Sequence, residues 1–211
     1  MRKVIQVLFV LIIIVLGYLI VESIMEPIRF NQEVEVRESA TIDRLIEIRD
    51  AQKAYKDIYK KYTGSFDTLI SFLDTTSFQV VKAIGDIPEE WLEELGFDKA
   101  RTKALAEGII SRDITQVPVL DSLFGKGFNA DSLQYVPYTE GVTFNLESGS
   151  ILTSSNLTVQ VVEAFVMYDD LLNGMDRQLV VNYKDERMKI VGFEGVKFGS
   201  MEEGTLTGNW E

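Results

Sequence analysis

Eighteen consecutive residues, Val4 to Val21, form a run in which Gln6 is the only strongly polar side chain. As an α-helix, such a run rises about 27 Å at ~1.5 Å per residue, which is close to the hydrocarbon thickness of a bilayer. The run is longer than the apolar core of a typical secretory signal peptide, and no Ala-x-Ala pattern of small residues follows it. We therefore predict a transmembrane anchor in preference to a cleaved signal peptide.

The charges that flank this run predict its orientation. Arg2 and Lys3 precede it, whereas the first charge after it is the acidic Glu22. Because Lys and Arg stay on the cytoplasmic side of a membrane, residues 1–3 are expected to form a cytoplasmic tip and residues 4–21 the transmembrane anchor. Everything after the anchor is then expected to lie outside the cytoplasm.

The composition excludes several classes of function. The chain contains no cysteine and no histidine, and its formal net charge is −12 at pH 7. Catalysis by Ser–His or Cys–His pairs and metal sites built on thiolate or imidazole are therefore excluded. The acidic charge argues against nucleic acid as a partner, because phosphate binding needs Lys and Arg. The lack of cysteine is ordinary for a bacterial envelope protein, so we expect the bacterial inner membrane, with the domain in the periplasm.

The sequence after the anchor predicts a second, amphipathic helix. Residues 22–38 are interpreted as a linker or as a continuation of the anchor helix, because helices usually end or kink at a proline such as Pro27. Ser39 or Thr41 is expected to cap the amphipathic helix, and Gly64 to end it in a left-handed conformation. The residues of its apolar stripe recur at steps of three and four: Ile42, Leu45, Ile48, Ala51 or Gln52, Tyr55, Ile58 or Tyr59, and Tyr62.

The exterior domain is expected to cover residues 39–211, with a helical part at 39–110 and a β-rich part at 111–211. Three short helices are predicted in the helical part, over Phe66–Leu73, Glu89–Leu95 and Lys99–Glu107. Val80–Ile84 is interpreted either as a helical continuation or as a strand. The glutamates of 89–95 are interpreted as a solvated face rather than as paired catalytic carboxylates.

From Ile114 onward the apolar pattern alternates with the period of a strand. Strands are predicted over Ile114–Val119, Leu133–Tyr138, Val142–Leu146, Leu157–Met167, Gln178–Tyr183, Met188–Phe193, Val196–Phe198 and Thr205–Trp210. Gln178–Tyr183 and Met188–Phe193 are expected to form a hairpin with a four-residue loop. Because helices come first and strands later, the sequence predicts an α+β fold with a C-terminal antiparallel sheet.

This order of elements and one local stretch resemble the type IV pilins and the pseudopilins of type II secretion. The stretch consists of Arg49-Asp50-Ala51-Gln52-Lys53-Ala54-Tyr55, then Tyr62-Thr63-Gly64 and Phe66-Asp67-Thr68-Leu69. The resemblance implies that the amphipathic helix packs on the sheet and that the apolar half contacts other subunits. Pilins carry a Gly before the apolar run, and none precedes Val4; the spacing from Gly17 to Glu22 lies at the exit of the anchor. We therefore expect a pilin-like fold on an uncleaved anchor.

One oxygen-rich stretch is a candidate metal site. Asp169, Asp170 and Asp176 lie with Asn173 around Gly174. Calcium takes six to eight oxygen ligands, and some of the pseudopilins that this chain resembles bind calcium in a C-terminal loop. The spacing does not match an EF-hand. An acidic turn between strands explains the cluster equally well, so both interpretations stay open.

These observations predict a non-enzymatic, single-pass membrane protein that serves as a structural or assembly component of a secretion- or pilus-like envelope complex. Its expected partners are the membrane and other envelope or secretion proteins, with no cofactor apart from the calcium candidate. The alternative is a membrane-tethered periplasmic binding module for a small ligand or peptide. A carboxylate-based hydrolase needs two acidic groups that face each other in a cleft, and no spacing in the sequence suggests such a pair.

Overall fold

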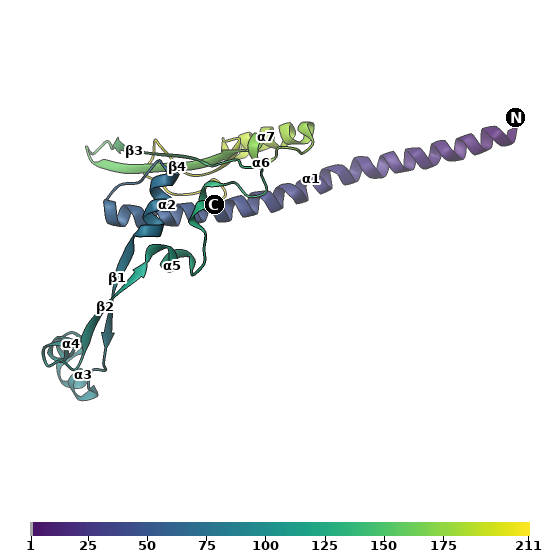
Figure 1. Cartoon of the computed structure of the whole chain (residues 1–211). Coiled ribbons are helices and arrows are strands. Elements are labelled where there is room, and N and C mark those ends of the chain that lie inside the picture. The colour runs from purple at the N-terminus through teal and green to yellow at the C-terminus, as the bar shows by residue number, and fades with distance from the viewer. Residues whose placement is uncertain (1) are drawn as a thin grey trace. The chain divides into compact units, whose positions relative to one another are not determined.

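The computed structural model describes the backbone of residues 2–211 and the side chains of residues 5–79, 85–110 and 115–211. The chain combines helices with antiparallel strands, and a long apolar helix begins it (Figure 1). The predicted mixture of helices and antiparallel sheet is confirmed at this level.

The chain divides into two compact units, one made of Met1–Leu69 with Asp131–Glu211 and the other of Ile70–Ala130. The elements follow in the order α1 (Arg2–Tyr59), α2 (Phe66–Thr75), β1 (Ser77–Ile84), α3 (Glu89–Leu95), α4 (Phe97–Ala106), β2 (Ser111–Pro118), α5 (Val119–Phe124), the 3-10 helix η1 (Ala130–Gln134), β3 (Asn145–Leu152), β4 (Thr158–Met167), α6 (Tyr168–Leu171), α7 (Arg177–Val191) and β5 (Gly195–Gly199).

Helix α1 is continuous over 58 residues and includes residues 22–38. It passes through Pro27, where the sequence predicts an end or a kink. A proline inside a helix removes one amide donor and weakens the helix locally. Phe30 and Val34, which follow it by one and two turns, are both buried, so tertiary packing holds the helix together beyond the proline.

The N-cap that the sequence predicts at Ser39 or Thr41 is wrong, because both residues lie inside α1. The Thr41 hydroxyl donates instead to the backbone carbonyl of Arg37, one turn earlier, at 2.7 Å. Threonine uses this bond when it sits inside a helix, since the hydroxyl then needs no other partner. A capping residue and a buried helical threonine look alike in the sequence.

One face of α1 is buried over its C-terminal half. The buried residues are Phe30, Val34, Thr41, Leu45, Ile48, Ala51, Gln52, Ala54 and Tyr55. The stripe begins earlier than predicted because the helix does, and it includes Thr41 in place of Ile42, which is half-buried. On the helix it ends at Tyr55, since Ile58 is 39% exposed and Tyr59 is 50% exposed, whereas Tyr62 is buried as predicted but lies beyond the end of α1.

The N-terminal half of α1 buries no described side chain before Phe30. Its large apolar residues between Ile5 and Met25 are each 40% to 66% exposed. Among the described residues, α1 is the one helix that is long and apolar enough to cross a membrane. A surface of this kind is costly in water, which is consistent with a membrane span.

Strands β3, β4 and β5 form an antiparallel sheet in that order, and α1 packs against β4 and β5. Ala164 pairs with Phe198 and Val166 with Val196, and all four side chains are buried. Cross-strand partners share one face of a sheet, so these residues form a single apolar face. The predicted strands at Leu157–Met167 and Val196–Phe198 are confirmed as β4 and β5.

The hairpin predicted at Gln178–Tyr183 and Met188–Phe193 is wrong, because this segment forms helix α7. The Asp176 carboxylate accepts a hydrogen bond from the Leu179 amide at 2.9 Å and so caps the helix. Gly192 ends it in the left-handed conformation, with φ of 70°. Val181 and Tyr183 alternate with polar residues as they would in a strand, but the caps Asp176 and Gly192 mark the two ends of a helix.

Other predicted strands are shorter or displaced. Leu133–Tyr138 lies partly in η1 and contributes one bridge, between Tyr135 and Thr143. The strand predicted at Val142–Leu146 begins only at Asn145, as β3. The last segment, Thr205–Trp210, is an extended tail rather than a strand, with one bridge between Phe198 and Gly208.

The end of α1 also differs from the prediction. The helix ends at Tyr59, and Lys60 rather than Gly64 adopts positive φ, at 61°. Gly64 has a different role, because a Cβ atom at this position would lie 3.2 Å from the backbone nitrogen of Ser148 in β3. The glycine therefore permits a close approach of two backbones.

The second unit contains an antiparallel ribbon of β1 and β2, with a register from Ser77 opposite Pro118 to Ile84 opposite Ser111. Val80–Ile84 is therefore strand, one of its two interpretations, and the strand predicted at Ile114–Val119 is largely β2. The helices predicted at 89–95 and 99–107 correspond to α3 and α4.

Candidate functional site

Four polar side chains meet where α6 and α7 pack on α1, and we name them the Glu38 cluster. Glu38 accepts hydrogen bonds from the hydroxyl of Tyr168 at 2.7 Å and from that of Tyr183 at 2.9 Å. The Arg187 guanidinium lies 3.3 Å from the same carboxylate and donates to the Tyr168 hydroxyl at 3.1 Å. The negative charge of Glu38 is thus held by three donors, one of them a cation.

Local structure explains how these residues converge. Tyr168 is the first residue of α6 and follows β4 directly, so the sheet positions it. Tyr183 and Arg187 are four residues apart on α7 and therefore share one face of that helix. Edge-on ring contacts of Tyr183 with Tyr168 and with Phe30 of α1 fix the same face against α1.

The electrostatics of the cluster determine the protonation of its two phenols. Burial, followed by the hydrogen bond to Glu38, raises the pKa of Tyr168 well above its usual range. Burial and the charge of Glu38 raise the pKa of Tyr183 to about 12. Both phenols therefore stay protonated at neutral pH and act as donors to the carboxylate.

A shallow groove of about 380 Å³ lies beside this cluster, along α1. Its lining residues are Asn31, Val34, Glu35, Glu38, Ser39, Ile42 and Tyr183. The groove is open, and Glu38 is already bound by the donors of the cluster. The other carboxylate among its lining residues is Glu35, which comes from α1 as Glu38 does.

Arg37 forms a second bond between α1 and the α6–α7 region. Its guanidinium Nη1 donates to the carbonyl of Leu171 at 3.1 Å and to that of Asn173 at 3.4 Å. Nε donates to Glu33 on the same helix at 2.8 Å, which orients the side chain. The arginine therefore satisfies carbonyl groups at the end of α6 that the short helix leaves unpaired.

The three predicted calcium ligands lie close in the sequence but have different partners. Asp169 pairs with Lys184 at 2.5 Å, and Asp176 caps α7. Asp170 lines a separate polar pocket that Arg37 also lines. Within the described part of the chain, no group of three or more acidic residues is arranged as a metal site. Calcium binding stays a prediction, and a shift of the melting temperature with added calcium would support it.

The pilin-like stretch contains a buried clamp that sequence reasoning missed. The Gln52 amide donates through Nε2 to the Thr63 carbonyl at 2.6 Å and accepts through Oε1 from the Thr63 amide at 3.1 Å. Gln52 is fully buried, and its side chain pairs with both backbone groups of Thr63, as a neighbouring strand would do. The signal available in the sequence is a Gln inside an apolar stripe.

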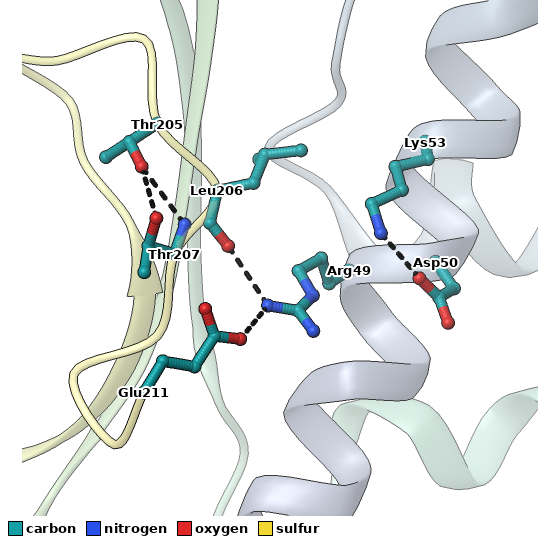
Figure 2. Close-up of polar contacts among 7 residues, drawn as sticks. All are labelled: Arg49, Asp50, Lys53, Thr205, Leu206, Thr207 and Glu211. Atoms are coloured by element: carbon teal, nitrogen blue, oxygen red, sulfur yellow. Dashed lines mark hydrogen bonds and ion pairs between the residues drawn. The ribbon is translucent and has the colours of Figure 1, made fainter.

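Arg49 joins α1 to the C-terminal tail (Figure 2). Its guanidinium Nη1 donates to the Glu211 carboxylate at 2.6 Å and to the Leu206 carbonyl at 3.3 Å. The tail in turn pairs with β5, because the Asn209 amide donates to the Lys197 carbonyl at 3.0 Å. The tail thus covers the outer edge of β5 and fastens it to the helix.

Comparison with protein-family models, with curated proteins and with solved structures gives no match to this chain. The geometry of the chain has one main feature: the N-terminal half of α1 is apolar and exposed, whereas the C-terminal half packs in the core of a domain.

Proposed function

We propose that this chain is a non-enzymatic, single-pass membrane protein of the bacterial envelope, and that it serves as a structural or assembly component of a larger complex. In this proposal the apolar half of α1 crosses the inner membrane, with the N-terminus in the cytoplasm. The domain that follows then lies in the periplasm.

One observation carries the proposal: the membrane-spanning candidate and the core helix of the domain are the same helix. The apolar residues from Ile5 to Met25 are exposed, whereas one face from Phe30 to Tyr55 is buried under the sheet. A flexible linker is enough to hold a domain near a membrane, but it does not fix the orientation of that domain. A continuous helix instead passes the position and tilt of the span directly to the domain.

The contacts at the junction support the same conclusion. Arg37 and the Glu38 cluster tie α6 and α7 to α1 within four turns of Pro27. These bonds restrain the domain about the helix axis just beyond the candidate span. Such rigidity is useful when neighbouring subunits must be placed in register, and it has no evident use in a solitary tether.

The resemblance to pilins and pseudopilins is part of this proposal. In the clamp of Gln52 on Thr63, two pieces of the pilin-like stretch contact each other. The helix-on-sheet packing of α1 against β4 and β5 is the arrangement that the resemblance implies. Assembly through the exposed half of α1 would use packing of helices inside the membrane.

The test is to extract the full-length protein from its native membrane in mild detergent and to measure the mass and composition of the particle. We expect a large particle that contains other envelope proteins in a fixed ratio. A short Gly-Ser insertion after Met25 should release the chain from that particle, because it uncouples the span from the domain. The same insertion in the exposed turn at 153–156 is the control and should leave the particle intact.

A lone monomer or dimer in the wild-type extract would contradict the assembly role. That outcome would favour the tethered binding module, and the pocket lined by Arg37, Tyr138 and Asp170 would then be the first place to search for a ligand.

A further inference from the structure

Helices α3 and α4 lie at the end of the β1–β2 ribbon (Figure 1). They contact each other, and Ala100 and Ala104 of α4 are buried together with Ile110 in the loop that follows. The Lys103 ammonium lies 4.1 Å from the centre of the Trp91 ring, a cation–π contact that joins the two helices. The pair is therefore a small folded body at the tip of the second unit.

This body leaves apolar side chains exposed at the turn between its helices. Phe97 is 63% exposed and Leu95 is 37% exposed, on either side of Gly96. Helix α3 has no buried residue, although it contains Trp91, Leu92 and Leu95. Trp91 and Leu92 are half-buried within the unit, so the apolar surface left open to a partner is the pair Leu95 and Phe97.

The same turn is strongly acidic. Residues 85–110 contain seven acidic and three basic side chains, and the four glutamates of α3 are all exposed. One of the basic residues, Lys103, is engaged by Trp91. The exposed apolar pair is therefore flanked by the carboxylates of Glu93, Glu94 and Asp98, in a segment where acidic residues outnumber basic ones.

We propose that Glu93, Glu94, Leu95 and Phe97, here called the α3–α4 corner, form a docking surface for a basic amphipathic segment of a partner protein. Such a segment would bury its apolar side chains against Leu95 and Phe97. Its Lys and Arg residues would pair with the glutamates, which would also steer its approach. This inference goes beyond the assembly role and does not depend on it.

The negative charge of the α3–α4 corner distinguishes between the partners that could bind there. Nucleic acid and anionic lipid would be repelled by the glutamates. A second copy of the same corner would bring like charges together, which disfavours self-association through this surface. A basic partner complements both the charge and the apolar pair.

The test uses the full-length protein in mild detergent with Trp210→Phe, so that Trp91 is the remaining tryptophan of the two in the chain. Three synthetic peptides without tryptophan serve as probes: a basic amphipathic Leu/Lys helix, its acidic Leu/Glu counterpart and a scrambled Leu/Lys sequence. We expect a saturable change of Trp91 fluorescence with the basic amphipathic peptide, weakened by salt, and none with the acidic one.

Variants of the corner make the result specific. Leu95→Ser with Phe97→Ser should lower the affinity about tenfold or more, because the apolar contact is lost. Glu93→Gln with Glu94→Gln should lower it and flatten its salt dependence. Asp185→Asn with Glu186→Gln, which neutralise exposed carboxylates on α7, are the matched control and should leave the affinity unchanged. Melting temperatures should stay constant throughout, since these side chains are exposed.

Several outcomes would overturn the proposal. These are the absence of a saturable response, an equal response to the acidic or scrambled peptide, and unchanged affinity in the Leu95→Ser, Phe97→Ser variant. Self-association that depends on Phe97, measured by analytical ultracentrifugation without any peptide response, would instead assign the corner to a second copy of the chain.

Discussion

Single polar residues in the interior of this protein replace backbone pairing that the fold lacks. Gln52 satisfies both backbone groups of Thr63, and Asn209 does the same for β5, where its side chain accepts from the Lys197 amide at 3.1 Å and donates to the Gly195 carbonyl at 2.9 Å. Buried backbone groups need such partners, because an unpaired one costs about 1–3 kcal/mol.

The clamp gives a prediction for stability. Gln52→Ala should lower the free energy of unfolding by about 1–3 kcal/mol, because the amide and the carbonyl of Thr63 lose their partners in a buried site. Lys53→Ala, on the exposed side of the same turn, is the control and should change it by less than about 0.5 kcal/mol. Chemical unfolding of the full-length protein in detergent measures both. Equal stabilities of the two variants would show that water replaces the clamp.

At the scale of elements, the differences between prediction and structure have a common physical cause. Strand β4 was predictable because its alternation reflects one buried face, and α3 was predictable because Pro88 and Gly96 bound it. Helix α7 was missed because its inner face carries Tyr183, Lys184 and Arg187 beside a single buried aliphatic residue, Val180. The three are half-buried through partners on α1, on α6 and just before β5, and such distant contacts leave no periodic signal in the chain.

The candidate site was unpredictable for the same reason. Glu38 is separated by 130 residues from Tyr168 and by 149 from Arg187, so only the packing of α6 and α7 on α1 brings them together. By contrast, the apolar half of α1 was predictable because its signal is a continuous run in the sequence.

The N-cap of α7 can be tested separately from the rest of the molecule. Asp176→Ala should lower the free energy of unfolding by about 1 kcal/mol, because the Leu179 amide loses its acceptor at the helix start. Asp185→Ala, in the exposed middle of the same helix, removes the same charge without a cap and should leave the stability nearly unchanged. Thermal unfolding followed by circular dichroism distinguishes them, and equal losses would contradict the capping role.

The Glu38 cluster predicts how stability depends on pH. Tyr183 has its pKa raised from 10.0 to about 12 on folding, and Tyr168 is shifted in the same direction. A raised pKa contributes stability that is complete below the unfolded value and is lost as the pH rises through the folded value. The free energy of unfolding should therefore fall between pH 10 and about 12.

Tyr183→Phe supplies the comparison for this prediction. It should be less stable than the wild type at pH 8, because Glu38 loses a donor, and should lose less further stability up to pH 12. Tyr138→Phe, which changes an exposed tyrosine outside the cluster, should follow the wild-type curve. Parallel curves for the wild type and Tyr183→Phe would show that the tyrosine does not titrate with unfolding.

At the scale of the whole molecule, α1 divides its length between two environments. Up to Met25 its apolar residues face outward, and from Phe30 onward one face belongs to the core. The boundary lies near Pro27, flanked by an exposed ion pair between Glu22 and Arg29. The helix therefore has two parts with separate surroundings: an apolar half that the proposed function places in a membrane, and a half that packs within the domain.

Two truncated chains separate the contributions of the two parts of α1 to stability. A chain that begins at Pro27 should be soluble without detergent and keep the melting temperature of the full-length domain, because it loses no buried side chain. A chain that begins at Glu35 also loses Phe30 and Val34, which are both buried, and each should cost about 1.5–3 kcal/mol. The second chain should also lose the edge contact between Phe30 and Tyr183, which loosens α7 on α1.

Differential scanning calorimetry and hydrogen exchange measure the two effects. Exchange in α7 should be faster in the chain from Glu35 than in the chain from Pro27, while exchange in β4 should change little, because β4 is the central strand of its sheet, paired on both sides. If both truncations melted at the same temperature with equal protection of α7, the first buried turns of α1 would contribute nothing to the domain. The continuous helix would then be a spacer, and the span would not be rigidly coupled to the domain.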